Sequence, residues 1–223
     1  MQKGFIMKIK ADLKALRQQA GYTLIELSIS VAIIAVLVVT GLYGVPRILD
    51  TNRTTTVTQQ ILLASANYSK IASQMFGQAK TFADSTTATG LASLGQMGVW
   101  SDDALIKSAT TGAVTRIIHP FGGAISSRSN ALTYSSLAAD EGVWIRLDAV
   151  PVKNCFAVTS AFMNSAVSAW VATDTTYSEP TAANVSGTTS PKVPGGAVSL
   201  TNLATLCQGA SGTTKSIYLL FAY

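Results

Sequence analysis

The sequence predicts an α+β fold, in which one long N-terminal helix packs on a C-terminal globular domain with an antiparallel sheet. An uncharged apolar run from Leu27 to Val45 continues into a helical repeat of apolar residues. After residue 76, short helical and strand-like segments follow without regular βα alternation, which favours α+β. About 175 residues follow the apolar run, enough for one domain with its own core.

The first 21 residues form a basic segment. They carry five basic residues and one acid, so +4 of the net charge of +5 lies there. Basic residues beside an apolar span stay in the cytoplasm, which predicts that the chain after Pro46 faces outward. The alternative is a solvated basic tail. A secretory signal peptide would need small residues after the apolar core, and Val39-Thr40-Gly41 matches this weakly.

The apolar run is long enough to cross a membrane, since 19 residues span about 28 Å as a helix. A helical repeat follows it, and we expect one helix from Tyr22 to about Met75. Gly41, Gly44 and Pro46 predict a bend or a melted turn between Gly41 and Arg47, and the glycines also permit close helix packing. The expected buried stripe is Val57, Ile61, Ala64, Tyr68, Ile71 and Met75, with Gln59, Gln60, Asn67, Lys70 and Gln74 on the polar face.

The remaining chain predicts mixed short elements. Residues 77–98 favour a loop with a short helix, and Ser101 is typical of a helix cap. The C-terminal segment Ser216–Tyr223 is apolar enough to be a central strand. We further expect strands at 117–126 and 142–147, an amphipathic helix over 154–171 that buries Val158, Phe162, Ala166 and Trp170, and an exposed loop over 174–196.

Two cysteines, Cys155 and Cys207, are typical of an exported protein in an oxidising compartment. A disulfide between them would stabilise the domain by about 4 kcal/mol in the chain-entropy model. Two free buried thiols are the alternative.

The sequence contains little that supports catalysis. We expect that the protein is not an enzyme and that it has no cofactor and no metal site. The single histidine, His119, precedes a proline and is more typical of a turn or core residue. No phosphate-binding loop or Cys/His cluster is present in the sequence. Scattered cations are expected to be solvated, although in a polymer they would be able to line a DNA-binding or adhesive groove. They are Arg47, Arg53, Lys70, Lys153, Lys192 and Lys215.

The most specific motif is Gly21-Tyr-Thr-Leu-Ile-Glu26 in front of the apolar run. A carboxylate at the edge of such a run is costly in lipid unless something neutralises it. With the basic leader, this string resembles the N-terminus of type IV prepilins. The long leader and the large mature chain resemble those of the type IVb subclass. Three further segments resemble toxin-coregulated pilus-type major pilins in particular: Leu94–Asp103, His119–Ser126 and Leu200–Cys207.

The resemblance implies four parts: a leader over 1–21, a hydrophobic helix over 22–46, its amphipathic continuation over 47–76, and a head domain over 77–223. Prepilin peptidase would cleave after Gly21 and N-methylate Tyr22. Glu26 would meet the terminal amine of a neighbouring subunit, and Cys155 and Cys207 would close the family's C-terminal disulfide loop.

The predicted function is therefore that of a type IV pilus subunit, held in the inner membrane and polymerised into an extracellular filament. The implied partners are prepilin peptidase, other copies of the chain, the pilus assembly platform and its ATPase machinery, with nucleic acid left open. The filament would serve adhesion, aggregation or DNA transfer. The alternatives are a minor pilin, a type II secretion pseudopilin, or a membrane-tethered periplasmic enzyme or binding domain.

Overall fold

The computed structural model describes residues 22–75, 80–134, 137–173, 179–181, 190–209 and 212–223. The leader and Gly21 lie outside these residues. The chain divides into two compact units, Met1–Leu49 and Asp50–Tyr223, and each is described by itself.

Helix α2 runs from Leu24 to Gln74, which confirms the predicted long helix. Every residue from Gly41 to Arg47 is helical, so the melted turn predicted as one of two outcomes is wrong. Pro46 removes only one backbone donor, and an uninterrupted helix on both sides tolerates that loss. The bend, the other outcome, stays a prediction.

In the second unit, α2 packs one face into the core of the domain. Val57, Ile61, Ala64 and Tyr68 are buried as the repeat predicts, and the stripe then continues to Ala72. The predicted last positions of the stripe, Ile71 and Met75, are only half-buried.

Gln60 corrects the predicted polar face, because it is buried. Its Nε2 donates a hydrogen bond to Oδ2 of Asp103 at 3.2 Å. A buried amide costs stability unless it is hydrogen-bonded, and the carboxylate of Asp103 supplies an acceptor that helical spacing alone does not reveal.

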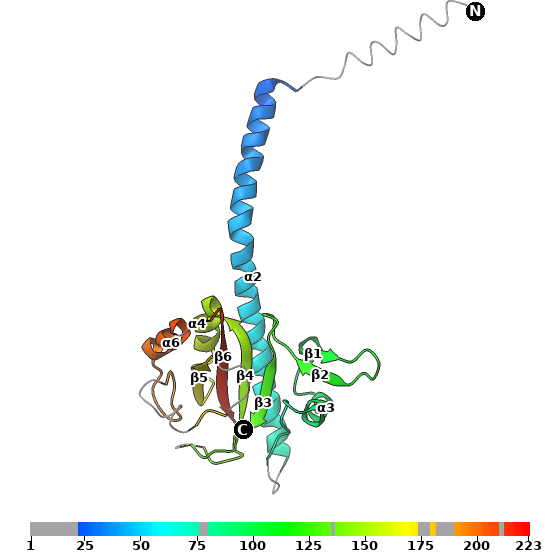
Figure 1. Cartoon of the computed structure of the whole chain (residues 1–223), viewed down its shortest axis with the longest axis vertical. Coiled ribbons are helices and arrows are strands. Elements are labelled where there is room, and N and C mark those ends of the chain that lie inside the picture. Colours follow the sequence, from blue (N-terminus) through cyan, green and yellow to red (C-terminus); the bar gives the residue numbers. More distant parts are fainter. Residues whose placement is uncertain (1–21, 76–79, 135–136, 174–178, 182–189, 210–211) are drawn as a thin grey trace, which may run out of the picture. The chain divides into compact units, whose positions relative to one another are not determined.

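Four antiparallel strands form the main sheet in the order β3–β4–β6–β5 (Figure 1). They span Ile125–Ser129, Gly142–Pro151, Thr214–Ala222 and Ser168–Ala172, respectively. The C-terminal strand β6 is therefore interior, as predicted, and the fold class is confirmed.

Both faces of this sheet are covered, which explains the unbroken apolar character of β6. Ile217, Leu219 and Phe221 join the core that includes the buried stripe of α2. Tyr218 and Leu220 point to the opposite face, where they form a second cluster with Tyr134, Leu137 and Trp144.

The domain also contains short helices and a separate two-stranded sheet (Figure 1). The predicted loop before residue 98 contains a short helix as expected, and the helix near the C-terminus was not predicted. The elements are α3 (Ala88–Gln96), the 3-10 turn η1 (Asp102–Ala104), β1 (Leu105–Lys107), β2 (Val114–Ile117), α4 (Val152–Ala161) and α6 (Leu200–Gln208).

Three local predictions were wrong. Ser101 precedes only η1 and makes no side-chain cap. The predicted strand 117–126 is not one strand but contains the end of β2 and the start of β3. The chain turns between them at His119, whose carbonyl accepts the N–H of Gly122 at 2.8 Å. The predicted helix 154–171 stops at Ala161. Trp170 instead lies in strand β5, where it pairs with Tyr218 of β6.

The expected loop 174–196 is described only in part. Within the described residues, Ser190, Pro191 and Pro194 are buried rather than exposed. Lys192 pairs with Ala169 by an isolated bridge along the edge of β5. The end of this segment is therefore part of the domain and covers a sheet edge, which protects unpaired backbone groups.

Candidate functional site

The described members of the predicted processing and assembly site lie at the start of α2. Tyr22 is exposed and lies two residues before the helix begins. The side-chain oxygen of Thr23 accepts the N–H of Glu26 at 3.3 Å, as an N-cap does. Glu26 lies at the positive end of the helix dipole, which favours a carboxylate there.

Thr23 caps the start of α2, a role that was not predicted from the sequence. The signal was present, because Thr23 and Glu26 have the Thr-x-x-Glu spacing of a capping box. The cap fixes where α2 begins, and therefore holds Tyr22 outside the helix and Glu26 inside its first turn.

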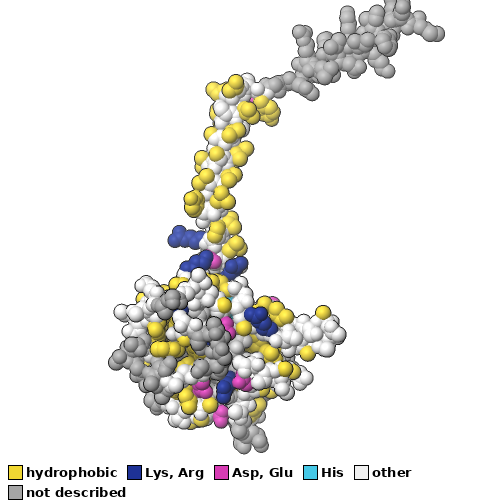
Figure 2. All heavy atoms as spheres, in the orientation of Figure 1, with side chains coloured by type: hydrophobic (Ala, Val, Ile, Leu, Met, Phe, Trp, Pro, Cys, Tyr) yellow, Lys and Arg dark blue, Asp and Glu magenta, His cyan; other side chains and the backbone are white. Residues whose placement is uncertain are grey.

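The following segment of α2 is apolar and buries nothing within the structure. Its most apolar 18-residue window has a mean hydropathy of 2.4, and none of that window is buried. By length and composition this helix is able to cross a membrane. Figure 2 shows apolar side chains along this part of the helix.

The hydroxyl groups in this segment are satisfied by the helix itself. Ser28 donates to the carbonyl of Ile25 and Ser30 to that of Glu26, both at 2.8 Å, and Thr40 donates to Val36 at 3.0 Å. A hydroxyl bonded to its own helix can enter hydrocarbon at a lower cost than one that needs water.

A hollow lies on the helix surface beside Gly41. A Cβ placed on Gly41 or Gly44 would meet no atom within 4 Å. The hollow is lined by Val38, Gly41, Leu42, Val45 and Pro46, all of which are apolar. Small residues at such a position let another helix approach its backbone closely.

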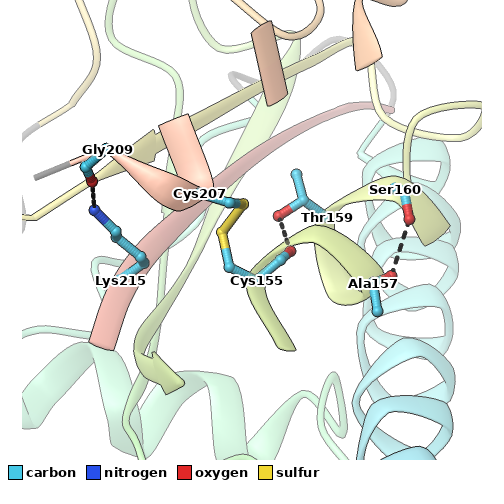
Figure 3. The surroundings of a disulfide bond; sticks show 7 residues. All are labelled: Cys155, Ala157, Thr159, Ser160, Cys207, Gly209 and Lys215. Carbon is cyan, nitrogen blue, oxygen red and sulfur yellow. Dashed lines mark hydrogen bonds between the residues drawn. A yellow bond between two sulfur atoms is a disulfide. The ribbon is translucent and has the colours of Figure 1, made fainter. Parts of the chain in front are cut away.

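The two cysteines form a disulfide that joins α4 to α6 (Figure 3). Both are buried, and Cys207 lies in the last turn of α6. Lys215 of β6 donates from Nζ to the carbonyl of Gly209, which follows that helix. The disulfide excludes the alternative of two free thiols. Lys215 is a buried cation that caps the helix carrying Cys207.

Two of the scattered cations are less solvated than expected, since Lys215 is buried and Lys192 is partly buried. The Nζ of Lys192 donates to the carbonyl of Met163, and partial burial lowers the pKa of this amine. Lys153 instead pairs with Asp50 at 2.5 Å. Lys192 and Lys215 therefore link segments of the domain, whereas the ion pair of Lys153 is largely exposed.

His119 lies at a turn and in the core, as predicted. It is buried, its Nε2 lies 2.6 Å from the carbonyl oxygen of Asp148, and its Nδ1 lies 3.3 Å from the amide nitrogen of Phe121. An amide N–H requires an acceptor, so Nδ1 is unprotonated and Nε2 carries the proton. Burial lowers the pKa of this imidazole. The described residues hold no cluster of three or more His, Cys, Asp or Glu suited to a metal ion.

A protein-family model described as the prokaryotic N-terminal methylation motif matches residues 16–42. This match includes Gly21, Tyr22 and Glu26, and it confirms the resemblance to prepilins at the N-terminus. A comparison with curated proteins finds no sequence match.

The solved structures that are similar to the chain include two type IV pilins. The type IVb pilin of Salmonella typhi is 14% identical, with a TM-score of 0.49, and the alignment covers 75% of this chain and 97% of that one. TcpA, a type IV pilin from the Vibrio cholerae El Tor biotype, is 20% identical, with a TM-score of 0.42 and coverage of 77% and 99%.

Proposed function

Because the chain has a prepilin-type N-terminus, we propose that it is the structural subunit of a type IV pilus of the IVb subclass. The methylation motif over residues 16–42 is the single observation that supports this most directly. The apolar, unburied first part of α2 is consistent with it, since such a surface requires lipid or other copies of itself.

The first step is processing by prepilin peptidase after Gly21. The bond to be cleaved precedes Tyr22, which is exposed and not helical and is therefore accessible to an enzyme. Cleavage removes the +4 basic segment and creates a free amine on Tyr22, which the same enzyme would methylate. The subunit then loses the cytoplasmic charges that anchor its N-terminus.

The second step is self-assembly through the first turn of α2. An ionised side chain in the bilayer centre costs about 2.5–3.5 kcal/mol on insertion scales. The new amine of one subunit can neutralise Glu26 of the next, and this pairing forms only at one axial register. Electrostatics would thus set the subunit step, while the exposed apolar side chains supply cohesion.

The hollow beside Gly41 supports the same step. It would receive an apolar side chain or the backbone of a neighbouring helix, because none of the described side chains of the first unit fills it. Van der Waals contact there adds cohesion that lipid tails alone do not provide.

These steps define where the protein acts and with what. The subunit would be held in the inner membrane with its domain outward, and would then be extracted by the assembly platform and its ATPase into an extracellular filament. Adhesion, aggregation and DNA transfer are the roles that such a filament would serve. A minor pilin or pseudopilin would be scarce in sheared fibres, whereas a major subunit would dominate them.

The test is to express the chain in a host that assembles type IVb pili. We expect Glu26→Val to insert and to be processed, but to reduce sheared filament yield more than about tenfold, since the register pairing is lost. Ser28→Ala is the matched control, because it removes a polar group two residues away without removing a charge. Normal filament yield from Glu26→Val would contradict the pairing role.

A further inference from the structure

A groove lies on the domain where β2 and the loop after it approach the ends of β4 and β6. It has room for about 260 Å³ and is lined by Arg116, Gly122, Gly123, Ala124, Asp148, Ala149, Thr173, Thr214, Lys215 and Ser216. This volume is slightly below the range of drug-sized ligand sites, so it suits a ligand of monosaccharide size.

The groove is produced by an irregular backbone. The pairing of β4 with β6 shifts between Leu147 and Val150, which leaves Asp148 and Ala149 in a bulge. Ala149 has a φ of 53°, in the left-handed region that a residue with a Cβ seldom adopts. Strain of this kind is retained where the surroundings enforce it, and it is frequent at binding sites.

Gly123 keeps the groove wall in place. A Cβ on this residue would lie 1.8 Å from the carbonyl oxygen of Asp148, so only glycine allows the two segments to approach so closely. The same carbonyl is bonded to Nε2 of His119 at 2.6 Å. The wall and the bulge are therefore fixed to each other before any ligand binds.

The charges in the groove leave one cation available. The carboxylate of Asp148 is already neutralised by the buried Arg146, whose Nη2 lies 2.6 Å from Oδ1 of Asp148. The ammonium group of Lys215 is engaged with the carbonyl of Gly209. Arg116 is exposed, and it takes part in none of the ion pairs among the described residues.

From these features we propose that the groove binds a sugar that carries a carboxylate, of the hexuronate or sialate class. The guanidinium of Arg116 has the planar fork that binds a carboxylate through two hydrogen bonds. The hydroxyls of Thr173 and Thr214, which also line the groove, match the ring hydroxyls of a sugar. All lining residues belong to the unit Asp50–Tyr223, so binding does not depend on filament assembly.

The experiment uses the full chain in detergent micelles, titrated with sodium glucuronate, N-acetylneuraminate and neutral glucose. We expect saturable binding of at least one acidic sugar with a dissociation constant on the order of 1 mM, and at least tenfold weaker binding of glucose. Binding should also weaken as salt is added, because the charge contact is exposed. Which acidic sugar binds identifies the source, uronate-bearing or sialylated glycans.

The decisive variant is Arg116→Gln, which removes an exposed charge and should fold normally. We expect it to weaken binding of the acidic sugar about tenfold or more, whereas Lys70→Gln, which removes an exposed charge away from the groove, changes it less than about twofold. Amide NMR shifts of the unaltered chain should map to Gly122, Gly123 and Ala149, which locates the site without any variant.

Three results would overturn the proposal. They are the absence of saturable binding of either acidic sugar, equal binding of glucose, and unchanged affinity in the folded Arg116→Gln variant. Loss of filaments in the assembly experiment would leave these results unaffected, so the two proposals fail separately.

Discussion

The ammonium nitrogen of Lys153 lies 2.5 Å from Oδ2 of Asp50, which ties the second half of α2 to the first turn of α4. The Lys153 side chain is 66% exposed and that of Asp50 is 25% exposed. Solvent therefore screens most of this attraction. An exposed ion pair of this kind contributes about 0–1 kcal/mol to stability.

We expect the variants Asp50→Asn and Lys153→Met to lower the free energy of unfolding by less than about 1 kcal/mol each. The loss relative to the unaltered chain should shrink in high salt, which screens the pair. Urea unfolding with the double variant in a mutant cycle measures this coupling. A coupling free energy above about 3 kcal/mol would show that the contact behaves as a buried pair.

The disulfide is expected to contribute far more to the stability of the domain than this ion pair. Replacing both Cys155 and Cys207 by Ser opens a loop that spans 52 positions, which costs about 4 kcal/mol in the chain-entropy model. Thermal unfolding of the domain should therefore occur at a clearly lower temperature, and added reductant should lower that of the unaltered chain but leave the double variant unchanged. An equal melting temperature for both proteins would contradict this.

Tyr68 is expected to stabilise the core through both its ring and its hydroxyl. The hydroxyl lies 2.6 Å from Oγ of Ser127, and burial raises the pKa of this phenol. Tyr68→Phe should cost about 1 kcal/mol, because a buried hydroxyl on Ser127 loses its partner. Tyr68→Ala should cost about 3–5 kcal/mol through the added cavity. Chemical denaturation compares the two variants, and equal losses would contradict the account.

His119 predicts a pH dependence of stability. Its pKa in the folded domain is lowered from 6.5, mainly by burial, so the unfolded chain binds the proton more tightly. The stability that depends on the neutral ring is therefore complete above pH 6.5, and it decreases as the pH falls below 6.5 toward the folded pKa. Protonation also converts Nδ1 from an acceptor to a donor, which breaks the bond from Phe121.

The matched variant is His119→Gln, whose amide can still donate to the Asp148 carbonyl but does not titrate in this range. Unfolding measured between pH 5 and 8 should show a smaller slope below pH 6.5 for this variant than for the unaltered chain. Identical slopes would mean that the imidazole does not couple to folding.

Sequence periodicity predicts the long elements of this fold well, and the reason is physical. The stripe Val57, Ile61, Ala64 and Tyr68 follows the helical period because one face meets the core. β6 is apolar throughout because both faces of an interior strand are covered. In each case the spacing of apolar residues along one segment indicates which of its faces are buried.

Positions that depend on distant partners could not be predicted in this way. Trp170 continues the helical spacing of Val158 and Phe162, yet pairing with Tyr218 makes it part of a strand. The burial of Lys215 depends on the carbonyl of Gly209, and that of Gln60 depends on Asp103. At the N-terminus, by contrast, Tyr22 and Glu26 could be singled out because the motif is contiguous.

The most direct test of the central claim is the N-terminal residue of the protein in fibres sheared from the cell surface, identified by mass spectrometry. The proposed processing and assembly predict abundant fibres whose subunit begins with N-methylated Tyr22. Fibres built from a chain that still begins at Met1, or a processed chain that never enters a fibre, would contradict it.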